Sequence, residues 1–241
     1  MDRRTLFASL LLIGNSDAAD TTLKLAVYLP QSPPYMFIDL NTGAVTGILP
    51  DIIKNYAQKH DLKFAYQYLN RVRAEHSLYN GSADVSLLAP AWVQYPDKLI
   101  YSDPLYVNGD RFYSVKPMPA KITFNGQVVC TREFFRYPIF DKLVEQKKVI
   151  RMDTESEVSQ LRMLLSGRCD YAYLNEWVAD YMIRNDFSFA QFYRAETTFD
   201  SSNGILAFHP KWQEQLPEFN EYIRQIKQSG ELTRIVESYT K

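Results

Sequence analysis

Hydrophobic and polar positions near the start of the chain alternate first with the period of a strand and then with that of a helix. Alternation over residues 23–29 predicts a β-strand, which ends in the proline-rich residues 30–34. Apolar residues then recur at three- and four-residue spacing over residues 49–57, behind a proline and an aspartate in the first turn, and predict a helix. Residues 62–68 predict a further strand. This order indicates an α/β fold with a parallel sheet.

An internal repeat indicates that this fold occurs twice. Residues 81–88 and 167–174 share the pattern Gly-x-x-Asp followed by an apolar run, and each copy comes after a helical stretch. Thr154 and Glu157 have the spacing of a capping box at the start of the second stretch. The glycine would end a helix and the aspartate would open a strand. The repetition predicts two similar α/β lobes.

Two crossings between these lobes are expected. Residues 106–115 form a polar and aromatic extended segment that would carry the chain into the second lobe, and a strand at 204–208 followed by amphipathic helices would bring it back. The predicted division is residues 20–108 with 204–241 in lobe 1, and 109–203 in lobe 2. Two crossings form a hinge, which lets a cleft close on a ligand.

The N-terminus has the order of a secretory signal peptide. Two arginines precede an apolar run at residues 6–14, which is too short to span a membrane, and small residues follow around Ala18 and Ala19. We predict a signal peptide over residues 1–19 and an exported, periplasmic mature chain. The alternative is an uncleaved amphipathic start of a cytosolic protein.

Composition excludes some partners and reactions. The 241 residues carry 27 basic and 28 acidic side chains, which leaves no positive field for a nucleic acid. The three histidines are far apart, and no nucleophile, phosphate-loop or metal-ligand motif is present. We therefore predict no catalytic residue, metal or cofactor, and we expect a monomer. Aromatic residues make up 14% of the chain, so some of them are candidates to face a ligand.

Cys130 and Cys169 are the two cysteines of the chain, and an exported protein permits them to pair. They fall on or beside predicted neighbouring strands of lobe 2. The alternative is two buried free thiols, because Cys130 sits within its strand and Cys169 before its own. That stagger could place their Cα atoms beyond bonding reach.

Several short motifs, in this order and spacing, resemble the periplasmic solute-binding proteins of family 3, best known for polar amino-acid uptake with ABC transporters. The motifs lie at residues 25–27, 33–37, 47–52, 81–84, 101–106, 167–170, 204–207 and 229–232. The resemblance covers nearly all of the mature chain. It implies a bilobed periplasmic-binding-protein-like fold of type II, a small-molecule ligand between the lobes, and delivery to an ABC permease in the inner membrane.

The chain departs from this family at two expected ligand contacts. By the resemblance, amino-acid binders of the family have an arginine for the ligand carboxylate where this chain has Tyr95 or Pro96, and a carboxylate for the ligand ammonium where it has Asn175. A buried unpaired charge costs several kcal/mol, so we expect common amino acids to bind poorly. Arg71, Arg73 and Arg132 are candidates for a displaced cation; the alternative for each is a solvated or structurally paired arginine.

The remaining candidates lie in loops after predicted strands, where open α/β sheets bind ligands. By the resemblance, Tyr35 takes the place of the aromatic residue that family members stack on the ligand. Phe134 and its neighbour Phe135 could face the ligand or pack on their own lobe. The candidate ligand-binding residues are Tyr35, Arg71, Arg73, Ala89, Trp92, Tyr95, Arg132, Phe134, Asn175 and Trp177.

Three functions remain open. The first is a binding protein for transport. The second is an exported enzyme on the same scaffold, a dehydratase-like lyase, which would need a cleft acid such as Asp103, Glu133 or Glu176. The third is an orphan accessory or sensor protein.

Overall fold

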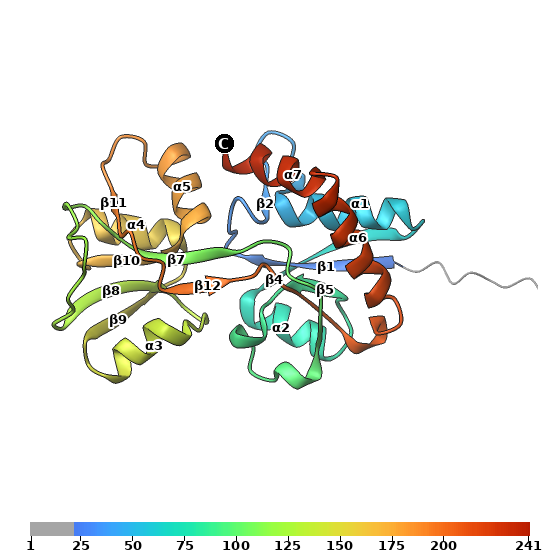
Figure 1. The fold of residues 1–241 in the computed structure, drawn as a ribbon, viewed down its shortest axis with the longest axis horizontal. Coiled ribbons are helices and arrows are strands. Elements are labelled where there is room, and N and C mark those ends of the chain that lie inside the picture. The colour runs from blue at the N-terminus through green and yellow to red at the C-terminus, as the bar shows by residue number, and fades with distance from the viewer. Residues whose placement is uncertain (1–21) are drawn as a thin grey trace, which may run out of the picture.

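The computed structural model describes residues 22–241, which form two α/β lobes placed side by side along the long axis of the molecule (Figure 1). The predicted bilobed α/β fold is confirmed. The predicted signal peptide, residues 1–19, lies outside the described residues. Within residues 22–241, no helix is long and apolar enough to cross a membrane.

Lobe 1 is built on a five-stranded sheet. Its strands, in spatial order, are β4 (Lys63–Asn70), β1 (Thr22–Leu29), β5 (Val85–Leu87), β13 (Leu206–Phe208) and β6 (Ile100–Tyr101). Strand β1 runs parallel to β4 and β5, whereas β13 is antiparallel to both of its neighbours. The helices of this lobe are α1 (Ile48–Lys59), α2 (Arg71–Tyr79), α6 (Leu216–Gln228) and α7 (Glu231–Thr240), and a short hairpin joins β2 (Phe37–Ile38) to β3 (Val45–Thr46).

Lobe 2 has a second mixed sheet. Its strands, in spatial order, are β11 (Tyr193–Arg194), β7 (Asn108–Ser114), β10 (Tyr171–Asn175), β8 (Gln127–Arg132) and β9 (Val149–Thr154), with β12 (Asp200–Ser202) paired to β7. Its helices are α3 (Pro138–Glu145), α4 (Glu157–Leu165) and α5 (Glu176–Asn185). Phe112, Phe140 and Tyr173 are fully buried between sheet and helices and form ring contacts with one another.

The internal repeat occupies equivalent places in the two lobes. Gly81 and Gly167 both adopt left-handed backbone, with φ of 73° and 70°, at the end of α2 and α4. Asp84 then accepts a hydrogen bond from the backbone N–H of Lys24 at 2.7 Å, and Asp170 accepts one from that of Val128 at 2.8 Å. Each aspartate therefore joins its own strand to the parallel neighbour. The four-residue pattern encodes this junction.

The chain crosses between the sheets twice. It leaves the first sheet after Tyr101 and enters the second at Asn108, and it returns between Ser202 and Leu206 (Figure 1). The C-terminal helices then pack on lobe 1, where Tyr239 donates a hydrogen bond of 2.7 Å from its hydroxyl to Asp51 of α1. The segments that connect the lobes are thus short and adjacent, as a hinge requires.

The structure joins Cys130 and Cys169 in a disulfide within lobe 2. Cys130 lies in β8 and Cys169 lies just before β10, and the two strands are parallel neighbours. Their Cα atoms are 5.9 Å apart, so the stagger between the two positions does not prevent the bond.

Candidate functional site

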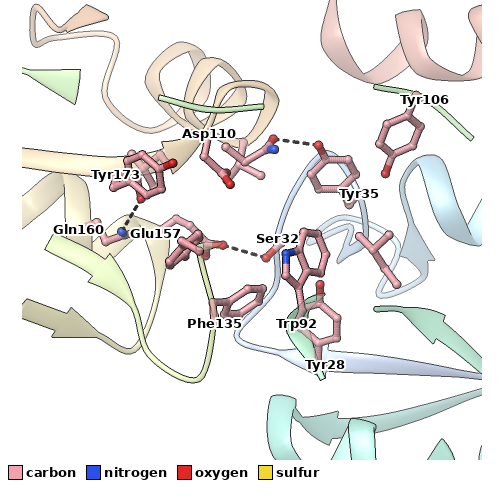
Figure 2. A pocket seen from close by; sticks show the side chains of 15 residues that line it. Tyr28, Ser32, Tyr35, Trp92, Tyr106, Asp110, Phe135, Glu157, Gln160 and Tyr173 are labelled. Carbon is pink, nitrogen blue, oxygen red and sulfur yellow. Dashed lines mark hydrogen bonds between the residues drawn. The ribbon is translucent and has the colours of Figure 1, made fainter. Parts of the chain in front are cut away.

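A cavity of about 50 Å³ lies between the two lobes, and seven of the 15 residues that line it are aromatic (Figure 2). Lobe 1 and the segment that leaves it contribute Tyr28, Ser32, Tyr35, Leu87, Trp92 and Tyr106. Lobe 2 contributes Asp110, Phe135, Tyr137, Glu157, Gln160, Tyr173, Leu174, Asn175 and Val178. A single water needs roughly 10–15 Å³, so the cavity has room for a few small groups while the lobes are in this closed arrangement.

Tyr35 connects the lobes at one side of the cavity. Its hydroxyl donates to Asn175 Oδ1 at 2.8 Å and accepts from Asn108 Nδ2 at 2.7 Å. Asn175 Oδ1 also accepts from the backbone N–H of Trp177 at 3.2 Å, which caps α5. Burial raises the pKa of Tyr35 well above its usual range, so its hydroxyl stays a neutral donor. The ring of Tyr106 stacks on Tyr35 with centroids 5.7 Å apart.

Arg132 connects the lobes at the opposite side. Its Nη1 donates to both carboxylate oxygens of Glu157, at 2.5 and 2.7 Å, and also to Ser32 Oγ of lobe 1. Its Nη2 donates to the backbone carbonyl of Pro30, also in lobe 1. Burial alone would lower the pKa of Arg132, but the Glu157 carboxylate raises it overall. The guanidinium is therefore charged and fully engaged by the protein.

The capping box predicted for Thr154 and Glu157 is wrong, and the reason bears on the site. Helix α4 begins at Glu157 and is capped by Ser156, whose Oγ accepts from the backbone N–H of Ser159. Thr154 still belongs to β9, and its hydroxyl donates to a carbonyl of β8. Glu157 is consequently free to turn toward Arg132 and the cavity.

Phe135 extends from lobe 2 between two arginines. Its ring centroid lies 5.2 Å from Cζ of Arg132 and 5.5 Å from Cζ of Arg71 in lobe 1, close enough for cation–π attraction. Trp92 contributes an aromatic neighbour at 6.2 Å. The preceding residue, Phe134, has a left-handed φ of 63° and is 61% exposed. Only the second phenylalanine of this pair lines the cavity.

Asp110 is one of the lining residues that the sequence analysis did not propose as ligand-binding; the others are Tyr28, Ser32, Leu87, Tyr106, Tyr137, Glu157, Gln160, Tyr173, Leu174 and Val178. In the sheet Asp110 lies opposite Asn175 of β10 on one side and Asp200 of β12 on the other. Asp200 is satisfied by the backbone N–H groups of Ile139 and Phe140 at the start of α3, at 2.7 and 3.1 Å. Burial first, and then the charge of Asp200, raise the pKa of Asp110 to about 8, although Asn175 donates a hydrogen bond to it.

Asp110 is the only acidic residue in β7, the strand that enters lobe 2. The structure buries most of this strand, although residues 108–114 are largely polar in the sequence. Such a strand has little access to water, so a carboxylate in it needs either a partner or a function.

The ten candidate residues fall into three groups. Those that line the cavity are Tyr35, Trp92 and Asn175. Those that lie behind its wall, in contact with lining side chains, are Arg71, Arg132 and Trp177. Those that do not line it are Arg73, Ala89, Tyr95 and Phe134. Both Nη atoms of Arg71 are occupied, since they donate to Glu75 and to the carbonyl of Trp92 at 2.9 Å, whereas its buried Nε has no hydrogen-bond partner within residues 22–241.

Two α/β lobes with two crossings and a lined cavity between them define a bilobed ligand-binding protein. The family described as bacterial extracellular solute-binding proteins, family 3, matches residues 25–241, and the chain belongs to this family. The resemblance found in the sequence motifs is thereby confirmed. No curated protein matches the chain.

Solved structures share the fold at low sequence identity. An ancestral arginine-binding protein bound to arginine matches with a TM-score of 0.77 and 20% identity, over 91% of this chain and 98% of the other. An ancestral amino-acid-binding protein, a precursor of cyclohexadienyl dehydratase, matches at 0.75 and 20%, over 91% and 96%. A histidine kinase sensor domain with similarity to periplasmic binding proteins matches at 0.73 and 18%, over 92% and 96%.

Proposed function

We propose that the chain is an exported, periplasmic protein that captures a small organic solute between its lobes and delivers it to an ABC-type permease. The observation that supports this function most directly is the interlobe cavity, lined from both lobes and bordered by two hinge segments. In this proposal residues 1–19 are the signal peptide, residues 20–108 and 204–241 form lobe 1, and residues 109–203 form lobe 2. The protein would act as a monomer without nucleic acid.

The ligand would not be a common amino acid. Tyr95 is 45% exposed and away from the cavity, and the oxygen of Asn175 already accepts bonds from Tyr35 and Trp177. The carboxylate of an α-amino acid would thus lack its usual charge-assisted contact, worth about 1.5–3 kcal/mol, and its ammonium would find no carboxylate at position 175. Loss of the carboxylate contact alone corresponds to roughly tenfold to a hundredfold in affinity.

A metabolite library screened by thermal shift tests the proposal. The mature chain, purified without refolding, should be stabilised by at least one small solute, because a ligand that binds only the folded state raises the melting temperature. Calorimetry should show no standard L-amino acid binding at micromolar affinity. A library without any hit would contradict the binding function, and a micromolar amino acid would restore ordinary amino-acid uptake.

The aromatic wall of lobe 1 should matter for every hit. Trp92→Ala and Tyr35→Ala should each weaken binding, because both rings line the cavity. Tyr68→Ala is the matched control, since Tyr68 lies on the edge strand β4, is 47% exposed and does not line the cavity. Equal affinities for all three variants would place the ligand elsewhere.

An exported lyase is the second candidate, and Asp110 is the observation that favours it. A buried carboxyl with a pKa of about 8 is suited to general acid–base catalysis. Asp103, Glu133 and Glu176, the acids suggested by the sequence, do not line the cavity. Incubation of each library hit with the protein, followed by mass spectrometry, would detect a dehydrated or cleaved product. A protein-binding accessory subunit would show neither product nor thermal shift.

A further inference from the structure

Two carboxylates line the cavity, and only one of them has a basic partner. Glu157 is paired with Arg132, so that pair carries no net charge. Asp110 forms no ion pair with any lysine, arginine or histidine among residues 22–241. Its carboxyl group points into the cavity, between Tyr173 and Tyr35 (Figure 2). When it is ionised, the cavity has an uncompensated negative charge.

One neighbouring group reinforces this charge. The acids that raise the pKa of Asp110 are Asp200 on β12, Glu176 at the start of α5 and Glu157 in α4. Glu176 is paired with Arg111 and Glu157 with Arg132, so Asp200 is the one without a basic partner among residues 22–241. The charge of Asp110 also contributes to the raised pKa values of Tyr35, Tyr137 and Tyr173, which are therefore neutral phenols. A ligand carboxylate placed here would be repelled, whereas a cation would be attracted.

The walls of the cavity favour the same kind of ligand. Aromatic rings attract cations through the negative potential of their faces, most strongly where water is excluded. Tyr28, Tyr35, Trp92 and Tyr106 line one side of the cavity, and Phe135 and Tyr137 line the other. The ring centroid of Phe135 already has the guanidinium carbons of Arg71 and Arg132 within 5.5 Å. The rings of Tyr35, Trp92 and Tyr106 have no arginine or lysine over them among residues 22–241, so these are the rings open to a ligand cation.

We propose that the cavity binds a small organic monocation, an amine or quaternary ammonium compound without a carboxylate, with Asp110 as its counter-ion and the aromatic rings as its walls. This inference rests on the proposed binding function and specifies its ligand class. Arg132 and Glu157 then act as a neutral latch between the lobes. The family's acidic position, Asn175, donates to Asp110 in place of contacting the ligand charge.

The proposal couples ligand binding to a proton. Burial and Asp200 hold the pKa of Asp110 at about 8, so at neutral pH the empty site is largely protonated. A cation pairs with the ionised form, and binding therefore releases the proton from Asp110 to solvent. The affinity for a cation should rise about tenfold per pH unit up to pH 8 and level off above it. An uncharged ligand should show no such rise.

Calorimetry with defined probes tests the proposal. The cations are methylammonium, tetramethylammonium and choline, and 3,3-dimethyl-1-butanol is the uncharged isostere of choline. At pH 8 the wild-type chain should bind at least one cation, with choline at least tenfold tighter than its isostere. Asp110→Asn should abolish that preference. Asp180→Asn is the matched control, because Asp180 lies in the same lobe outside the cavity, half-exposed and paired with Arg194.

The outcomes separate the ligand class from the function. A cation preference that disappears in Asp110→Asn and persists in Asp180→Asn supports the proposal, and so does the tenfold rise per pH unit in the wild-type chain, which needs no variant. No cation binding at millimolar concentration, or equal binding of choline and its isostere, overturns it. If neutral or zwitterionic library compounds still bind in that case, the solute-binding function stands and only the ligand class is wrong.

Discussion

The two lobes share a strand–helix–strand framework but present different chemistry to the cavity. Lobe 1 lines it with aromatic rings, one leucine and the hydroxyl of Ser32, and with no charged side chain. Lobe 2 adds three further rings, Phe135, Tyr137 and Tyr173, but it also supplies both carboxylates, Asp110 and Glu157, and the amides of Gln160 and Asn175. The repeated Gly-x-x-Asp junction fixes the strands in each lobe and leaves these lining positions free to differ.

This difference assigns separate tasks to the lobes in the proposed function. An aromatic wall excludes water, and exclusion of water lowers the local dielectric. Charges on the opposite wall then act more strongly on a ligand than they would in solvent. Lobe 1 would thus provide desolvation, and lobe 2 would select for charge.

The largest effect is expected at the latch of lobe 2. Arg132→Met leaves Glu157 as a buried charge without its partner, and breaking such a pair costs about 3–5 kcal/mol. The double variant Arg132→Met with Glu157→Met should recover most of that loss. Urea unfolding at pH 7 measures both. Arg224→Met is the control on lobe 1: its pairs with Asp103 and Glu221 are exposed, so it should cost under about 1 kcal/mol. Equal losses for the two arginines would contradict the latch.

The disulfide should stabilise lobe 2 more than lobe 1. A loop closed over a separation of 39 residues contributes about 3–4 kcal/mol in the chain-entropy model. Replacement of Cys130 and Cys169 by alanine should therefore speed hydrogen exchange in β8 and β10, while β1 and β4 stay protected. Intact mass should rise by two hydrogen atoms on reduction. An unchanged mass would mean that the two thiols are free.

Fold and site differ in how far the sequence determines them. The strand at residues 23–29, the helix at 49–57 and the repeated Gly-x-x-Asp pattern are local, so periodicity and turn chemistry are sufficient to predict them. Tyr35 and Trp92 could be proposed as lining residues because each follows a predicted strand, and the family resemblance pointed to Tyr35 and Asn175.

The other contacts of the site join residues that are far apart in the sequence. Arg132 meets Ser32 and Pro30 from another lobe, and no local pattern encodes that contact. Asp110 was missed because its importance depends on Asp200. That residue lies opposite Asp110 in the sheet but comes from β12, which is distant in the sequence. For Tyr95 the motif position indicated a ligand contact, whereas in the structure its side chain is 45% exposed and does not line the cavity.

The third effect is a pH dependence confined to lobe 2. The pKa of Asp110 is raised in the folded state to about 8, from an ordinary value of 3.8. The folded state therefore holds a proton that the unfolded state releases, and stability is lost as the pH rises from about 4 to 8. Between pH 5 and 7 the wild-type chain should lose about 2–3 kcal/mol relative to Asp110→Asn. Thermal unfolding of both proteins across this range measures the difference. Parallel pH profiles would mean that Asp110 ionises normally.

The smallest effect is expected where lobe 1 meets the latch. Ser32 Oγ accepts from Arg132 and donates to Glu157 at 3.0 Å, and these bonds hold the lobes together without a ligand. Ser32→Ala removes them at a cost of about 0.5–1.5 kcal/mol, enough to shift an open–closed equilibrium several-fold. Small-angle scattering should show a larger radius of gyration for this variant than for wild type, and a ligand should reduce it. Ser238→Ala, in α7 and away from the cavity, is the control. Identical curves for the three proteins would show that the Ser32 bonds do not keep the lobes closed, and closure would then rest on the remaining interlobe contacts, such as Tyr35 with Asn175 and Arg132 with Pro30.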